Sequence, residues 1–423
     1  MAKIDDSVKK KVPELRFKGF TDDWEQRKFD ECFNFPVSTN SLSRALLNYD
    51  EGDIKSVHYG DILIKYPAIL NIKNDKIPYI TGGKLEKYKS SLLENGDLIF
   101  ADAAEDETVG KAVEVNGLTE ENLVAGLHTI VARPKDKKAE FFLGYYINSN
   151  TYHRQLLRLI QGSKVSSISK GNLQKTLVSF PKDFEEQQKI GAFFKKIDDT
   201  IALHQRKLDL LKEQKKGYLQ KMFPKNGAKV PELRFAGFAD DWEERKLGDF
   251  VIDYVEKTTT QNQFPVLTSS QQQGIVLQET YFANRQVTTD NNIGYYVLPR
   301  GYFTFRNRSD NDVFIFNRND LIDKGIISYF YPVFTLKNSD SDFFLKRINN
   351  GIKRQVSIQA EGTGQHVLSM KKFKNIISMF PSLEEQEKIG SFFKQLDNTI
   401  ALHQRKLDLL KNQKKGFLQN MFV

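Results

Sequence analysis

The chain has 423 residues, including 32 phenylalanines, 16 tyrosines and one cysteine, and carries a formal net charge of +9. Its apolar and aromatic content excludes a disordered chain and suffices for at least two domains with separate cores. The lone Cys32 excludes an internal disulfide and a cysteine-based zinc site, and no run of about 20 apolar residues predicts a membrane span.

The positive charge favours a polyanionic partner, most simply nucleic acid, although many proteins carry such a charge without one. The N-terminal sequence MAKIDDSVKKK does not resemble a signal peptide. We therefore expect a cytoplasmic protein without membrane partners.

The first element in chain order is a short segment that returns in the middle of the chain. It reads VPELRFKGFTDDWEQRK from Val12 and VPELRFAGFADDWEERK from Val230. We assign residues 1–28 to an N-terminal scaffold segment, and residues 224–246 to a linker with the second scaffold segment. The recurrence indicates a duplicated scaffold.

Two inserts follow the scaffold segments: the first insert, residues 29–180, and the second insert, residues 247–380. Short apolar or alternating runs bounded by Gly, Asn, Asp and Pro predict strands in both. These runs are GDILIKY from Gly60, DLIFAD from Asp97, LHTIVARP from Leu127, GYFTFRN from Gly301 and IISYFYPVFTL from Ile326. Helical pieces are predicted near residues 141–160 and 343–358, so each insert is expected to have an α+β fold.

The two inserts are alike only near their C-terminal ends. There Arg154-Gln155 aligns with Arg354-Gln355, and Phe180-Pro181 aligns with Phe380-Pro381. We interpret the inserts as one fold that carries different surface side chains.

Each insert is followed by a predicted long helix, at residues 181–223 and 381–423. A stretch of 39 residues that starts at Glu185 and again at Glu384 is identical at 31 positions. Seam positions recur at steps of four and three along both copies, which is the heptad pattern of a coiled coil. The predicted seam is formed by Ile190, Phe194, Ile197, Ile201, His204, Leu208 and Leu211, and by Ile389, Phe393, Leu396, Ile400, His403, Leu407 and Leu410.

A heptad helix cannot bury its seam alone, so we expect the two helices to pair with each other; pairing between two copies of the protein is the alternative. A pseudo-two-fold axis between the halves would make the helices antiparallel, with the inserts at opposite ends and His204 and His403 as packing positions that set the register.

The order of scaffold, insert and helix occurs twice, as in a circle. Residues 1–11 are therefore expected to take the place that residues 224–229 have in the other half.

These repeated elements resemble the specificity subunits of type I restriction–modification systems. The resemblance is carried by the Glu-Glu-Gln-x-Lys-Ile start of each helix, the two VPELRF segments and a (Q/E)G(S/T) element before each helix. It implies that the inserts are target recognition domains, each reading one half of a bipartite site in double-stranded DNA. It also implies that the helices set the spacer and dock two modification (methyltransferase) subunits, which restriction (translocase and nuclease) subunits join in a bacterial cytoplasm.

Motifs of catalysis are missing from the sequence. There is no Walker loop GxxxxGK(S/T), no methyltransferase motif, and no metal-ligand spacing among the six histidines. We expect no catalytic residue, metal or cofactor in this chain. The resemblance implies a non-catalytic subunit of a type I deoxyribonuclease and adenine-specific DNA methyltransferase complex, whose S-adenosylmethionine, ATP and magnesium belong to partner subunits.

Base readout requires polar or basic side chains on protruding loops. In the first insert the candidates are Lys73, Lys76, Tyr79, Thr81, Lys84 and Lys87. In the second insert they are Thr268, Ser269, Ser270, Gln271, Gln272, Gln273, Arg285, Arg306, Asn307, Arg308 and Ser309. The alternative is that these clusters are solvated loops.

A free-standing bivalent DNA-binding protein or regulator without enzymatic partners is the alternative function. Copurification with a methyltransferase subunit would distinguish the two hypotheses. A self-contained nuclease or methyltransferase is disfavoured by the missing motifs, and a purely structural adaptor would not need two divergent inserts.

Overall fold

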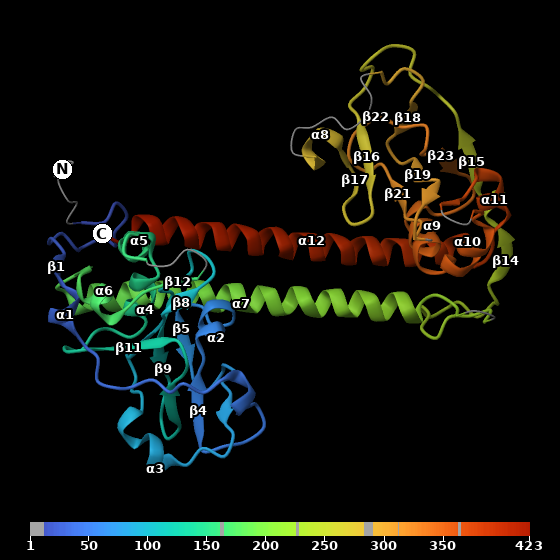
Figure 1. Cartoon of the computed structure of the whole chain (residues 1–423). Helices are drawn as coiled ribbons and strands as arrows, with labels where there is room; N and C mark the ends of the chain where they lie inside the picture. Colours follow the sequence, from blue (N-terminus) through green and yellow to red (C-terminus); the bar gives the residue numbers. More distant parts are fainter. Residues whose placement is uncertain (1–11, 161–164, 226–227, 283–290, 312, 363–364) are drawn as a thin grey trace. The chain divides into compact units, whose positions relative to one another are not determined.

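The structure is a computed structural model that describes residues 12–160, 165–225, 228–282, 291–311, 313–362 and 365–423. It divides into two compact units (Figure 1). Unit 1 contains Met1–Gln205 and Arg405–Val423, and unit 2 contains Arg206–Gln404. Each unit thus combines one insert with part of each long helix. Among the described residues, no helix is both long and apolar enough to span a bilayer.

The first insert is built on a five-stranded sheet with the order β2-β11-β7-β9-β5 and a four-stranded sheet with the order β10-β4-β6-β3. The five strands are β2 (Phe33–Asn34), β11 (Thr129–Pro134), β7 (Leu98–Ala101), β9 (Ala112–Asn116) and β5 (Ile69–Asn71). The four strands are β10 (Asn122–Ala125), β4 (Ile54–Val57), β6 (Tyr79–Ile80) and β3 (Leu47–Asn48). All of β7 is buried, which explains its uninterrupted apolar run.

Short helices and strand pairs complete the first insert. The helices are α1 (Phe29–Cys32), α2 (Tyr59–Ile64), α3 (Leu85–Tyr88), α4 (Phe142–Ile147), α5 (Asn150–Leu157) and α6 (Lys170–Gln174). Strand β8 (Ala103–Ala104) pairs with β12 (Ser166–Ser167), and β1 (Glu25–Lys28) pairs with β13 (Leu177–Phe180). Because β1 belongs to the scaffold segment, the second pair joins the scaffold to the end of the insert.

The second insert has a four-stranded sheet with the order β15-β23-β19-β21 and several two-stranded sheets. The four strands are β15 (Val251–Tyr254), β23 (Val333–Leu336), β19 (Phe303–Phe305) and β21 (Phe316–Arg318). The pairs are β16 (Leu267–Ser270) with β17 (Gly274–Leu277), β18 (Tyr296–Pro299) with β22 (Lys324–Ile327), β20 (Arg308–Ser309) with β24 (His366–Val367), and β14 (Glu243–Lys246) with β25 (Ile377–Phe380). The helices are α8 (Gln278–Tyr281), α9 (Ser341–Asn350), α10 (Lys353–Gln359) and α11 (Met370–Asn375).

Two strand predictions are corrected by the structure. The run GDILIKY is not a strand, because Tyr59–Ile64 forms α2. The His58 side chain accepts a hydrogen bond from the Gly60 N–H at 3.2 Å, which satisfies a free donor at the start of this helix. The run from Ile326 is not one strand either, because a turn from Ser328 to Tyr331 separates β22 from β23.

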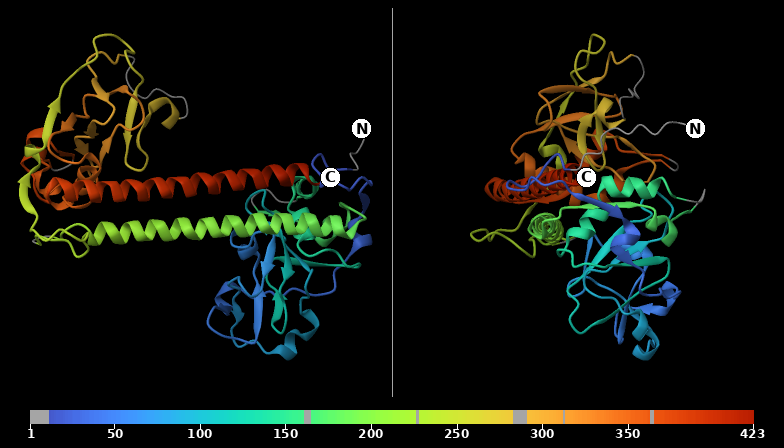
Figure 2. Two further views of the ribbon diagram at one scale, coloured as in Figure 1. Left: turned by 180° about the vertical axis from the view of Figure 1, so that it is seen from behind. Right: turned by 90° about the vertical axis from the view of Figure 1, so that its left-hand side faces the viewer.

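The two long helices, α7 (Phe184–Lys221) and α12 (Leu383–Asn420), each contain 38 residues. In unit 1 the ring centroids of Phe193 and Phe417 lie 5.0 Å apart, and Asp198 pairs with Lys414 at 2.5 Å. Since higher numbers on α7 meet lower numbers on α12, the helices are antiparallel, as predicted. Figures 1 and 2 show them side by side.

Unit 2 repeats this pairing with the other parts of the helices. Tyr218 and Phe392 lie 5.0 Å apart between ring centroids, and Lys215 pairs with Asp397 at 2.6 Å. Among the predicted seam residues, the buried ones are Ile190, Phe194, Leu208, Ile389, Phe393 and Leu407. The half-buried ones are Ile197, Ile201, His204, Leu211, Leu396, Ile400, His403 and Leu410.

The scaffold segment clamps the start of each helix through a buried ion pair. Arg16 of the first VPELRF segment donates two hydrogen bonds to Glu186, at 2.7 and 2.8 Å, and Glu186 is only 1% exposed. Arg234 of the second segment binds Glu385 with the same two distances. Glu186 and Glu385 thus each hold a part of the chain that is distant in sequence. Their negative charge near the helix N-terminus also interacts favourably with the helix dipole.

The circular order of the chain is also visible in backbone contacts. In unit 1 the Leu15 N–H donates to the Asn420 carbonyl at 2.9 Å, and in unit 2 the Leu233 N–H donates to the Lys221 carbonyl at 2.9 Å. The scaffold segment therefore lies beside the end of a long helix in both units, although only in unit 2 is it continuous with that helix. The place predicted for residues 1–11 lies outside the described residues.

Candidate nucleic-acid interface

Most candidates in the second insert line one pocket of about 520 Å³, which we call the hairpin pocket. The predicted residues that line it are Thr268, Ser269, Ser270, Gln271, Gln272, Arg306, Arg308 and Ser309. They come from the hairpin β16–β17 and from the segment formed by Arg306 and strand β20, which are distant in sequence. The structure thus brings together two clusters that are about 35 residues apart in the sequence.

Local hydrogen bonds hold the hairpin tip in place. The Ser270 hydroxyl accepts from the N–H groups of Gln272 and Gln273 at 3.2 Å each. Gly274 has a positive φ of 72°, which favours glycine at the end of the turn. Asn317 of β21 donates to the Ser269 hydroxyl at 2.8 Å, which ties the tip to the central sheet. A fixed tip presents the exposed glutamine side chains without a large entropic cost on binding.

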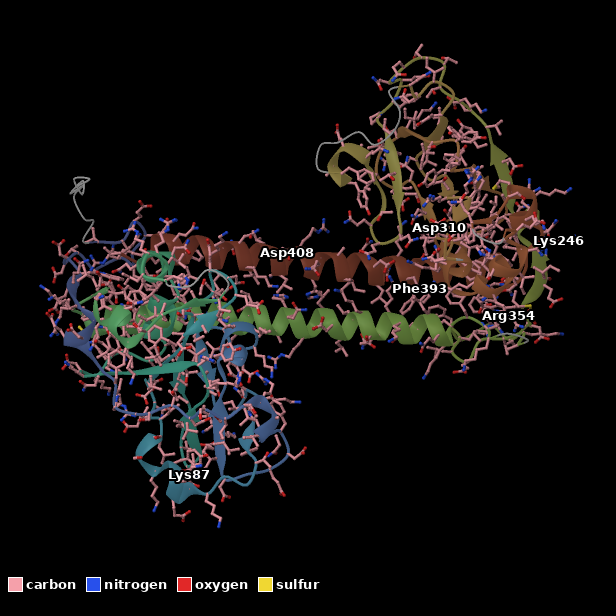
Figure 3. All side chains as sticks on the ribbon, viewed as in Figure 1. Lys87, Lys246, Asp310, Arg354, Phe393 and Asp408 are labelled. Carbon is pink, nitrogen blue, oxygen red and sulfur yellow. The ribbon has the colours of Figure 1, made fainter. Side chains whose placement is uncertain are left out.

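The other wall of the pocket is cationic and aromatic. Arg306 and Arg308 are exposed, and the guanidinium of Arg308 stacks 4.5 Å from the centroid of the Phe330 ring. Burial raises the pKa of the nearby Tyr331, so its hydroxyl remains a neutral donor. Asp310, labelled in Figure 3, is the acidic residue among those lining side chains that the structure describes. Arginine, amide and hydroxyl groups in one concave surface match the donors and acceptors of base edges.

Three candidates in the second insert stand apart from this group, and one of them, Gln273, is exposed beside Gln272 but does not line the pocket. Asn307 does not line the pocket, and its Oδ1 atom is buried without a hydrogen-bond partner in the described part of the chain. Arg285 lies outside the described residues.

The first-insert candidates fall into separate groups. Tyr79 and Thr81 lie on or directly after β6, where Lys55 is 5.6 Å from the Tyr79 ring centroid and Asn48 donates to the Thr81 hydroxyl at 3.1 Å. Lys84 precedes α3, and Lys87, labelled in Figure 3, belongs to it. Lys73 and Lys76 are exposed in the connection between β5 and β6. These residues come from separate places in the first insert, whereas most candidates of the second insert share the hairpin pocket.

Equivalent backbone contacts point to another surface in the first insert. Asp102, before β8, donates its N–H to the His128 carbonyl, just as Asn307, before β20, donates to the Phe330 carbonyl. His128 therefore stands where Phe330 stands beside the hairpin pocket. Its Nδ1 lies 3.2 Å from Asp102 Oδ1.

Further polar groups adjoin His128. Its ring lies 5.2 Å from that of Tyr59, which in turn lies 4.7 Å from His58. Arg44 is 3.4 Å from His58 Nδ1. Burial lowers the pKa of His58, with help from the Arg44 charge, so the ring is neutral at pH 7. We name Arg44, His58, Tyr59, Asp102 and His128 the histidine cluster.

The histidine cluster was missed because its members are far apart in sequence. A signal was present: DLIFAD and GYFTFRN are both strand runs that end in a polar residue before the similar C-terminal parts of the inserts. An alignment of the two runs places Asp102 of the first insert at the position of Asn307 in the second insert. Among the described residues, no group of three or more His, Cys, Asp or Glu side chains is arranged to hold a metal ion.

The fold and these surfaces define a duplicated scaffold that presents two different polar faces. The family model described as "Type I restriction modification DNA specificity domain" matches residues 21–213 and 239–412. The chain therefore belongs to this family, and its function is that of the DNA specificity subunit of a type I restriction–modification system. Such a subunit is not an enzyme on its own.

Similar proteins agree with this assignment. The chain is 23% identical over 413 residues to a putative type I restriction enzyme MjaX specificity subunit of Methanocaldococcus jannaschii, covering 94% of this chain and 92% of that protein. It is 24% identical over 211 residues to the MjaVIII specificity subunit of the same organism, covering 47% and 44%. Its fold is similar to the crystal structure of a type I S subunit from M. genitalium, with a TM-score of 0.59 and 13% identity over 97% and 99% of the two chains.

Proposed function

We propose that each insert reads one half of a bipartite site in double-stranded DNA and that the paired helices set the spacer between the halves. The hairpin pocket carries this proposal, because it gathers the predicted readers of the second insert on one anchored surface. In the first insert the corresponding readers are the histidine cluster together with Tyr79, Thr81 and the lysines at positions 73, 76, 84 and 87. Different side chains at equivalent places suit an asymmetric target.

We further propose that two modification subunits dock on the helix pair. Four leucines on the helices are strongly exposed: Leu203 (59%) and Leu409 (57%) in unit 1, and Leu210 (58%) and Leu402 (59%) in unit 2. The Asp198–Lys414 pair sets the register so that Leu203 and Leu409 lie at one level of the helices. Exposed leucines repeated in each unit favour two equivalent partners.

Catalysis in this proposal belongs to the partners. The modification subunits bring S-adenosylmethionine, and restriction subunits bring ATP and magnesium, in the bacterial cytoplasm where the chromosome lies. A free-standing regulator would have no need for repeated docking surfaces, and the family assignment does not favour it.

The test is methylation mapping in cells that express the chain with its modification subunits. Wild-type protein should give one bipartite motif. Arg306→Ala or Arg308→Ala should relax one half of the motif, at a cost of about 1–3 kcal/mol for each lost base contact. Arg300→Ala, which removes an exposed arginine bound to Asp323 outside the pocket, is the control. A motif without two parts, or unchanged specificity in both pocket variants, would refute the assignment.

A further inference from the structure

Unit 2 contains a buried cation without a counter-ion among the described residues. Arg347 of α9 is 3% exposed, and its Nε donates to the Ser378 hydroxyl at 2.9 Å. Its Nη1 is buried and has no hydrogen-bond partner in the described part of the chain. Burial lowers the pKa of Arg347 to about 10, so the group is still charged at pH 7. The Phe223 and Trp242 rings lie 5.9 Å from the guanidinium carbon, but such cation–π contacts are weaker than the cost of burying a charge without a counter-ion. We therefore expect an anion to neutralise Arg347.

The guanidinium lines a pocket of about 380 Å³ with a cationic rim. Three more basic residues line it, namely Arg354, Lys225 and Lys229, against one carboxylate, Glu244. Arg354, labelled in Figure 3, is exposed on α10. The charge balance at this pocket is therefore positive, even though Lys225 and Lys229 also pair with Glu232 and Asp241.

A second polar side chain in this pocket also lacks a partner. The Oε1 atom of Gln355 is buried and makes no hydrogen bond to any described residue. Oxygen and nitrogen of a glutamine amide exchange places by a simple rotation, so Gln355 can present N–H donors to the same space. Both side chains line the pocket, so a small movement of the guanidinium and of the amide can bring their donors to one acceptor-rich ligand.

Unit 1 lacks the charge at the matching position. Phe142 of α4 packs on Trp24 and Phe343 of α9 packs on Trp242, which aligns the two helices. Four residues further along lies Tyr146 in unit 1 and Arg347 in unit 2. The Tyr146 hydroxyl accepts a hydrogen bond from the Ser179 N–H at 2.6 Å, so the position is neutral and satisfied.

A glycine makes room for the arginine in unit 2. A Cβ at Gly351 would overlap with Nη1 of Arg347. A side chain at position 351 would therefore displace the Arg347 guanidinium from its present place.

We propose that this pocket binds a phosphate group. A guanidinium is suited to an oxyanion, and tetrahedral phosphate offers acceptors to Arg347, Arg354 and Gln355 from different directions. The phosphate belongs either to a free ion or to the backbone of DNA. The proposal does not depend on the function proposed for the inserts.

The first experiment measures the thermal midpoint of the full chain in sodium phosphate and in sodium chloride at equal ionic strength. Wild-type protein should show a saturable rise in phosphate. Arg347→Met should lose the rise, and the exposed Arg354→Ala, which leaves the core intact, should weaken it. Lys371→Ala, which removes an exposed lysine of α11 outside the pocket, should keep it.

Several results would overturn the proposal. One is an equal thermal midpoint in both salts for wild-type protein, as expected if water or a partner's carboxylate fills the pocket. Another is a rise that survives in Arg354→Ala and in Arg347→Met. If Arg347→Met does not fold, the wild-type titration and Arg354→Ala decide the question.

A second experiment identifies the source of the phosphate. If the source is DNA, Arg354→Ala should weaken binding to all duplexes alike and lower the slope of log affinity against log salt by about one. If DNA binding is unchanged while phosphate still stabilises the wild type, the ligand is the free ion. Either result supports the phosphate site if the first experiment shows the saturable rise of the thermal midpoint and its loss in the pocket variants.

Discussion

Units 1 and 2 share their scaffold contacts and differ in the side chains that face outward or fill their pockets. The clamp, the scaffold-to-helix backbone contact and the antiparallel helix pairing occur in both units at matching positions. At the helix surface, Asp198 accepts from the Tyr145 hydroxyl in unit 1, whereas its counterpart Asp397 pairs with Lys346 in unit 2. The comparison indicates that the contacts between insert and long helix need the same geometry in both units. The side chains around these contacts can differ.

The clamp should give the largest effect in both units. Arg16→Ala leaves the Glu186 carboxylate buried without its partner, which should lower the free energy of unfolding by about 3–5 kcal/mol in urea denaturation. Arg234→Ala should cost the same. Lys216→Ala, which removes an exposed ion pair with Glu213, should cost less than about 0.5 kcal/mol. If Arg16→Ala or Arg234→Ala lowered the free energy of unfolding no more than this control does, the shared role of the clamp would be contradicted.

The pH dependence should distinguish the units. Burial raises the pKa of Glu114 in unit 1 to about 7, above the 4.5 of an unfolded glutamate. Between pH 4.5 and pH 7 the folded state therefore binds more protons than the unfolded state. The contribution of Glu114 to the free energy of unfolding should fall by about 3 kcal/mol over this pH range. Glu114→Gln should flatten that slope in urea titrations at several pH values.

Asp397 in unit 2 should act in the opposite direction. Burial disfavours its ionised form, but hydrogen bonds from Lys215 and Lys346 outweigh burial and lower its pKa. Its stabilisation is present above the unfolded pKa and is lost as pH falls through the folded pKa. Asp397→Asn should thus destabilise the protein at pH 7 and have little effect in acid. The same loss at both pH values would exclude a role for its charge.

Gly191 and Gly390 mark close contacts between helix and insert. A Cβ at Gly191 would lie 2.5 Å from the Glu140 carbonyl oxygen, and one at Gly390 would lie 2.9 Å from the Phe343 nitrogen. Alanine at either position should cost about 1–3 kcal/mol in urea denaturation, because backbone must move. Equal stability of wild type and variant would show that helix and insert are not in this close contact.

Gly217 and Gly416 should give the smallest effect and the opposite sign. A Cβ there would meet no described atom within 4 Å, which excludes close approach of a neighbour in the described chain as the reason for glycine. Alanine should stabilise each helix by about 1 kcal/mol through its higher helix propensity. Gly217→Ala and Gly416→Ala should raise the urea midpoint alike, and a lowered midpoint would contradict this assignment.

The fold was largely predictable because its signals are periodic. The heptad pattern and the repeats predict the two helices, their pairing and the circular order. The helix α2 was not predicted, since its start depends on the His58 cap and on Asp61, which Arg44 and Lys65 hold at 3.0 and 2.9 Å. These local polar contacts do not appear in an apolar pattern.

The candidate interface was predictable only in part. The hairpin glutamines and Arg306 and Arg308 could be named because each cluster is contiguous in sequence. The histidine cluster could not, because strand register alone brings Asp102 beside His128. Likewise, the role of Glu186 in the clamp depends on Arg16, which lies 170 residues away.

In the proposed function the helix pair sets the distance between two half-sites, each of which is read by its own insert. Inserting one heptad into both helices, after Arg206 and after Arg405, lengthens the pair, keeps its seam in register and keeps the four exposed leucines. Methylation mapping of this variant with its modification subunits should give both half-sites unchanged with a longer spacer. An unchanged spacer, or altered half-site sequences, would contradict the account.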